Sequence, residues 1–114
     1  MRPFAALLLL SLSLVASACG PVQSSAVISD AEAAVEKART AEAPKYALYN
    51  FTLAELLLHK AREEAGYADF ETAVKLAEKA IENAELASQK TARAIHERGP
   101  GTPPAGSPTP VEPQ

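Results

Sequence analysis

The sequence predicts an all-α protein: a small three-helix bundle or helical hairpin with a long C-terminal helix, spanning residues 28–98. Two observations carry this prediction. Between residues 70 and 95, apolar or small residues recur at alternating steps of four and three, the spacing of one helix face packed against a partner helix. Residues 46–65 form a second, more apolar stretch, and Gly66 separates the two. We therefore expect two helices that fold back on each other.

A first, weaker helix is expected to begin near residue 28. Ser29 or Asp30 is a suitable N-cap, and the apolar positions that follow at steps of three and four are mostly alanine. Pro44 should end this helix near residue 43, because the residue before a proline avoids the helical conformation. The same proline is tolerated in the first turn of the next helix.

The turn between the second and third helices is the best defined in the sequence. Gly66 is the expected left-handed residue that ends the second helix, and Asp69 is a good N-cap for the third. The third helix should run from Phe70 to about Arg98, a length of roughly 40 Å at 1.5 Å per residue. It is expected to be the longest of the three.

Large side chains of the second helix and the start of the third are expected to make the packing or interaction contacts. These residues are Tyr46, Tyr49, Leu53, Leu57 and Phe70. The facing surface of the third helix is rich in alanine, so the helices can approach closely but bury little apolar area at each contact. Small domains already bury a low fraction of their surface. We expect a marginally stable monomer, or one stabilised by self-association or by another protein.

Residues 1–18 have the layout of a secretory signal peptide. A positive start at Arg2 is followed by an apolar run of about a dozen residues and by the small residues Ala16, Ser17 and Ala18. A membrane-spanning helix would need roughly 20 apolar residues, so a mature transmembrane anchor is disfavoured. Export from the cytoplasm is the resulting prediction.

The small residues that end at Cys19 resemble the lipobox of bacterial lipoproteins, although that family most often has leucine in place of Ala16. The resemblance implies cleavage before Cys19 and a covalent lipid such as palmitate on that cysteine. Gly20 stands where an aspartate would retain such a protein at the inner membrane, which implies the periplasmic face of the outer membrane. The alternative is ordinary signal peptidase cleavage after Ala18, which leaves a soluble periplasmic protein with a free thiol.

The segments that flank the helical domain are expected to be irregular. Residues 19–27 would be the lipidated N-terminus and a short tether. Residues 99–114 are rich in proline and glycine and lack apolar periodicity, which is typical of a disordered tail.

Several motifs between residues 28 and 94 resemble a bacterial family that carries a domain of unknown function, DUF4398, and that is common in short envelope lipoproteins. The motifs are APKYA at 43–47, LAELLL at 53–58, KAREE at 60–64, GYADF at 66–70, Ala73, and LAEKA at 76–80. The resemblance implies a helical fold and an envelope setting, without a known activity.

The hairpin around Gly66 also resembles a single tetratricopeptide unit. The matching small and aromatic positions are Ala61, Gly66, Phe70, Ala73, Ala77 and Ala80. Repeat solenoids need about three units, so a tetratricopeptide-like hairpin is the better description.

The sequence argues against catalysis, cofactors, metal ions and nucleic acid. The formal net charge is −3, so a phosphate-binding surface is not expected. His59 and Glu63 lie one helical turn apart, but two ligands are too few for a structural metal site. The sequence contains no glycine-rich phosphate loop, and we expect no small-molecule substrate.

The expected function is that of a membrane-anchored envelope lipoprotein whose helical domain binds an envelope protein or a second copy of itself. One alternative is a structural spacer between the outer membrane and the cell wall. Another is a soluble periplasmic binder, if Cys19 carries no lipid.

Overall fold

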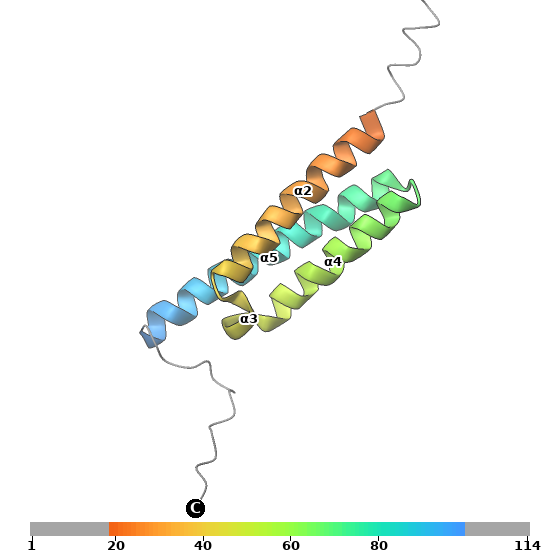
Figure 1. The fold of residues 1–114 in the computed structure, drawn as a ribbon. Coiled ribbons are helices and arrows are strands. Elements are labelled where there is room, and N and C mark those ends of the chain that lie inside the picture. The colour runs from red at the N-terminus through yellow and green to blue at the C-terminus, as the bar shows by residue number, and fades with distance from the viewer. Residues whose placement is uncertain (1–18, 100–114) are drawn as a thin grey trace, which may run out of the picture.

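A computed structural model of the chain describes residues 19–99, which contain four helices and no strand (Figure 1). The helices are α2 (Cys19–Thr40), α3 (Ala43–Tyr46), α4 (Leu48–Gly66) and α5 (Phe70–Arg98). The all-α prediction is confirmed, and α5 has the predicted bounds. The predicted signal peptide with Ala16, Ser17 and Ala18, and the predicted tail from residue 100 onward, lie outside the described residues.

Helix α5 is the element against which the other helices pack. It contacts α2, α3 and α4, and the three long helices lie side by side (Figure 1). Its buried residues follow alternating steps of four and three: Ala73, Ala77, Ala80, Ala84, Ala87 and Thr91. The sequence predicted the stripe Phe70, Val74, Ala77, Ile81, Ala84, Ser88, Thr91 and Ile95, which contains three of these six residues: Ala77, Ala84 and Thr91. The others belong to the core because α5 meets one helix on each side, so its buried surface is wider than a single stripe.

The core consists mainly of methyl groups. Among the described residues, eleven of the fourteen buried apolar residues are alanine, and the three larger ones are Val35, Phe51 and Leu58. The largest side chain that is completely buried is that of Thr91, whose hydroxyl donates a 2.8 Å hydrogen bond to the Ala87 carbonyl. Alanine allows neighbouring helices to approach closely, which favours dispersion contacts between backbones.

Helix α2 begins about ten residues earlier than the sequence predicts, so the expected tether at residues 19–27 is helical and the expected caps Ser29 and Asp30 lie inside the helix. Pro21 is tolerated because it stands in the first turn, where backbone N–H groups have no helical acceptor. Ser24 is buried, and its hydroxyl donates to the Pro21 carbonyl at 3.1 Å. Packing and local hydrogen bonds therefore override a weakly helical composition.

The connection between α2 and α4 contains the predicted proline break. Helix α2 ends at Thr40, and Glu42 takes a left-handed conformation with φ 68°. Pro44 then stands in the first turn of α3, as expected. The predicted second helix is therefore divided: Tyr46 ends α3, and Ala47 separates it from α4.

The turn between α4 and α5 confirms one prediction and corrects another. Asp69 caps α5 by accepting a hydrogen bond from the Thr72 backbone N–H at 3.1 Å. Two hydrogen bonds from Thr72 lower the pKa of the Asp69 carboxyl. The bond from the Thr72 side chain has the larger effect and the bond from its backbone the smaller. The left-handed residue is Ala68, with φ 63°, whereas Gly66 is the last residue of α4. The glycine was thus placed correctly at the helix end, but its left-handed conformation was wrong.

Candidate interaction surfaces

Helix α4 carries apolar side chains on two opposite faces. Its core face is formed by Phe51, Ala54, Leu58 and Ala61, all buried. On a helix of 3.6 residues per turn, Leu56 points away from both Ala54 and Leu58. Leu56 is 62% exposed and Tyr49, seven residues earlier, is 76% exposed. Leu53 lies between them and is half-buried. We call Tyr49, Leu53 and Leu56 the outer face of α4.

The five side chains predicted to pack or interact are distributed unevenly. Leu57 packs against the core cluster, and Tyr46, Leu53 and Phe70 are half-buried. The prediction that Tyr49 packs within the bundle was wrong, because its side chain is exposed. The predicted set favours large residues, whereas the close seam with α5 selects small ones. The spacing of Phe51, Ala54, Leu58 and Ala61 by three and four could have identified the core face.

A polar contact borders the outer face of α4 where it meets α5. The buried Asn50 donates from Nδ2 to Asn83 Oδ1 at 3.1 Å and accepts at Oδ1 from Lys90 Nζ at 2.6 Å. Asn83 Nδ2 in turn donates to the Lys79 carbonyl at 2.9 Å. Both polar atoms of the Asn50 side chain are therefore satisfied, which buried amides require.

Two arginine–glutamate pairs connect α2 with α4. Arg39 Nη2 lies 2.6 Å from Glu55 Oε1, and Arg62 Nη2 lies 2.7 Å from Glu32 Oε1. The two partners on each helix are seven residues apart and carry opposite charges. A parallel arrangement of the same helices would bring like charges together, so these exposed pairs favour the antiparallel orientation. These pairs were not predicted from the sequence, because their regularity appears only once the register of the two helices is known.

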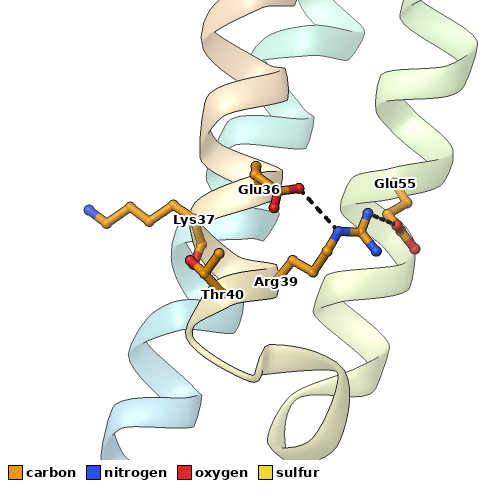
Figure 2. A network of polar contacts seen from close by, with 5 residues as sticks. All are labelled: Glu36, Lys37, Arg39, Thr40 and Glu55. Atoms are coloured by element: carbon orange, nitrogen blue, oxygen red, sulfur yellow. Dashed lines mark hydrogen bonds and ion pairs between the residues drawn. The ribbon is translucent and has the colours of Figure 1, made fainter.

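Arg39 makes further contacts around this pair, as Figure 2 shows. Its Nε donates to Glu36 Oε2 at 3.2 Å, the second dashed contact of Arg39 in Figure 2. Outside that view, its guanidinium carbon lies 5.2 Å from the centre of the Phe51 ring. The hydrogen bond with Glu55 is the main cause that raises the pKa of Arg39. The guanidinium group thus covers one edge of the core while half of its side chain stays exposed.

The start of α2 packs tightly against the start of α5. A Cβ atom on Gly20 would lie 3.3 Å from Cδ2 of Phe70, closer than most real contacts of this kind. Both residues line an open hollow of about 410 Å³, together with Gln23, Val74 and Glu71 among others. Gly20 therefore has a packing reason to be glycine, and its predicted role in sorting stays a prediction.

Two properties of the described residues bear on the predicted chemistry and on membrane attachment. Within residues 19–99, no three His, Cys, Asp or Glu side chains gather to form a possible metal site. In the same part of the chain, no helix is both long and apolar enough to cross a membrane.

The family comparison covers most of this architecture. Residues 26–99 match the model of DUF4398, described as a domain of unknown function. The chain belongs to the DUF4398 family. The match includes α3, α4, α5 and the larger part of α2, and it leaves out the first turns of α2 with Gly20. No curated protein and no solved structure matches the chain.

Proposed function

We propose that this DUF4398 protein is a lipid-anchored lipoprotein of the bacterial cell envelope whose helical domain is a non-catalytic protein-interaction module. The observation that carries the interaction role is the outer face of α4. Leu56 and Tyr49 remain exposed, while the opposite face of α4 packs in the core cluster of the bundle. Because a helix with apolar residues on opposite faces is normally buried on both, α4 has the composition of a helix that meets a partner.

The anchoring part of the proposal rests on the sequence around Cys19. Ala16, Ser17 and Ala18 precede the cysteine after an apolar run, in the layout of a lipoprotein signal. Several acyl chains on one residue give stable membrane attachment, at about 0.8 kcal/mol per buried methylene group. With Gly20 next in the chain, we propose the periplasmic face of the outer membrane as the location.

The α4–α5 hairpin also supports the likeness to a tetratricopeptide unit. Ala61 of α4 and Ala73, Ala77 and Ala80 of α5 are completely buried, so the small positions of that motif line the seam between the arms. We propose a tetratricopeptide-like hairpin that is completed by α2, which takes the place of a neighbouring repeat.

Site-specific photocrosslinking in the bacterial envelope tests the interaction role. A photoreactive residue at Leu56 is expected to give a discrete crosslinked species, either twice the mass of the chain or a heterologous complex. The matched control carries the same residue at Ala92, which is exposed on α5. Adding Tyr49→Lys to the Leu56 probe should abolish the product, because a charge there cannot be desolvated cheaply. Equal crosslinking from Ala92, or none from Leu56, would contradict the interaction role.

The anchor has its own test, the intact mass of the N-terminal fragment after expression in a bacterium that processes lipoproteins. Acyl chains on Cys19 are the expected result. An unmodified Cys19 would contradict the anchor and favour the soluble periplasmic binder.

A spacer between membrane and cell wall is the second candidate, and the length of α5 favours it. With 29 residues against 19 in α4, α5 extends beyond its neighbour by roughly 15 Å at 1.5 Å per residue. Shortening α5 by two turns at its C-terminal end would impair a spacer but leave an interaction module intact. Substitutions on the outer face of α4 would have the reverse effect.

A further inference from the structure

The start of α2 and the α4–α5 turn lie at the same end of the bundle (Figure 1). The contact between Gly20 and Phe70 fixes them together, because there is no room for even one additional carbon on Gly20 without a shift of the ring. Helix α2 begins at Cys19 itself, so no irregular segment separates this cysteine from the bundle. The backbone at Cys19 therefore lies next to the α4–α5 turn.

The same end carries two exposed apolar side chains. Val22 in the first turns of α2 is 67% exposed, and Tyr67 in the α4–α5 turn is 74% exposed. Phe70, which packs against Gly20 at this end, is half-buried. We call Val22, Tyr67 and Phe70 the hairpin end. Tyrosine combines an apolar ring with a hydroxyl group, and it is enriched where one end of a side chain meets lipid and the other meets water.

The hairpin end carries a small excess of acidic groups, because residues 60–75 contain three basic and four acidic side chains. Lys60 Nζ lies 3.0 Å from Glu64 Oε1 and Lys75 Nζ lies 2.6 Å from Glu71 Oε1. Arg62 pairs with Glu32 of α2, as described above. Because these cations already have carboxylate partners, the hairpin end offers no basic cluster of the kind that recognises anionic lipids. Its surface suits a zwitterionic lipid layer.

We propose that the hairpin end rests on a zwitterionic lipid surface, with Tyr67 and Val22 in the headgroup region. The bundle then stands on the membrane by one end, and the outer face of α4 is directed sideways over the surface. This inference rests on the proposed acylation of Cys19. One tyrosine and one valine would bind a membrane weakly by themselves. A covalent anchor at Cys19, three residues before Val22, makes the contact intramolecular and raises its effective concentration.

Tryptophan fluorescence of the full-length acylated protein in vesicles tests this orientation. The sequence contains no tryptophan, so one introduced residue is the sole indole emitter. The Tyr67→Trp variant reports on the hairpin end. The Tyr49→Trp variant is the matched control, since both tyrosines are similarly exposed and lie about 27 Å apart along α4, at 1.5 Å per residue. The vesicles consist of phosphatidylcholine with or without bromine atoms on the acyl chains.

The Tyr67→Trp variant should show emission shifted to shorter wavelength and a severalfold loss of intensity in brominated vesicles, while the Tyr49→Trp variant changes in neither respect. Replacing part of the phosphatidylcholine by anionic phosphatidylglycerol should strengthen neither signal, because the hairpin end has no basic cluster. Quenching of both variants would mean that the bundle lies on its side, and quenching of neither would mean that the end stays in water. Either result would overturn the proposal.

Vesicle flotation and the intact mass of each variant separate this inference from the proposed function. If the acylated protein floats with the vesicles but the Tyr67→Trp variant is not quenched, the lipid anchor is supported and the end-on orientation is contradicted. A protein that is not acylated and does not float overturns both. Circular dichroism of the two variants should match the parent protein, because both tyrosines are exposed.

Discussion

The two apolar faces of α4 differ in the size of their side chains. The core face combines Phe51 and Leu58 with Ala54 and Ala61, and all four are buried. The outer face has Tyr49, Leu53 and Leu56, none of them small and none completely buried. Within this bundle, hydrophobicity alone does not decide which side of a helix faces the core. The side that faces the core is the one with alanine at every second contact position, because only that side allows α5 to approach closely.

This difference has an energetic consequence. An alanine contributes only one methyl group, and each buried methylene or methyl group is worth about 0.8 kcal/mol. The core is built mainly of such residues, so much of its stability must be concentrated in Val35, Phe51 and Leu58. The outer face holds apolar surface that the bundle itself does not use. A partner that covers Tyr49 and Leu56 would bury additional apolar surface and so increase the free energy of unfolding, to which the alanine-rich core contributes little.

The largest expected effect comes from Phe51→Ala, which removes the largest side chain of the core face. We expect a loss of about 3–5 kcal/mol in the free energy of unfolding, the usual range for a buried phenylalanine. The control is Tyr49→Ala on the outer face, which should change the same quantity by less than about 0.5 kcal/mol. Urea denaturation followed by circular dichroism measures both. Equal losses from the two variants would mean that the outer face supports the fold as much as the core face does.

An intermediate effect is expected where a small residue is enlarged. Ala77→Leu places three additional carbons in a position that is completely buried on α5. Overpacking of this kind costs about 1–3 kcal/mol. Ala92→Leu makes the same change at an exposed position of the same helix and should be nearly neutral. A thermal transition of the Ala77→Leu variant that matches the parent would show that the alanine seam is loosely packed and that size does not select the core face.

The prediction from sequence was most successful for α5. Its bounds at Phe70 and Arg98 and its cap at Asp69 were correct, because periodicity and capping chemistry are local signals. Helix α2 shows the opposite case. Gly20, Pro21 and Ser24 indicate an irregular segment locally, and only the contact with Phe70 and the burial of Ser24 make a helix favourable there. Such contacts between segments distant in sequence cannot be inferred from composition.

The candidate surface was predicted in part, for a reason that can be stated physically. Tyr49 and Leu53 were identified as important because they are large, and the structure places both on the outer face of α4 rather than in the core. The sequence did not reveal which side of α4 faces the core, because the three consecutive leucines 56–58 place an apolar side chain on several sides of the helix. The complementary charges of Arg39 with Glu55 and of Arg62 with Glu32 would have fixed it, but their pairing depends on a register that only the folded bundle supplies.

The smallest effect is expected from Asn50, which stands at the border between the two faces. Asn50→Ala removes its hydrogen bonds with Asn83 and Lys90, yet water can replace it, because the Lys90 side chain is exposed and that of Asn83 is partly so. The expected cost is therefore about 1 kcal/mol, near the mean for an ordinary hydrogen bond rather than the larger cost of an unpaired buried group. Gln89→Ala, an exposed substitution on α5, is the matched control and should be neutral. If Asn50 only connects α4 to α5 and does not contact the partner, crosslinking from Leu56 persists in the Asn50→Ala variant. Loss of that crosslink without loss of the fold would instead make Asn50 part of the outer face and extend the interaction surface across the seam to α5.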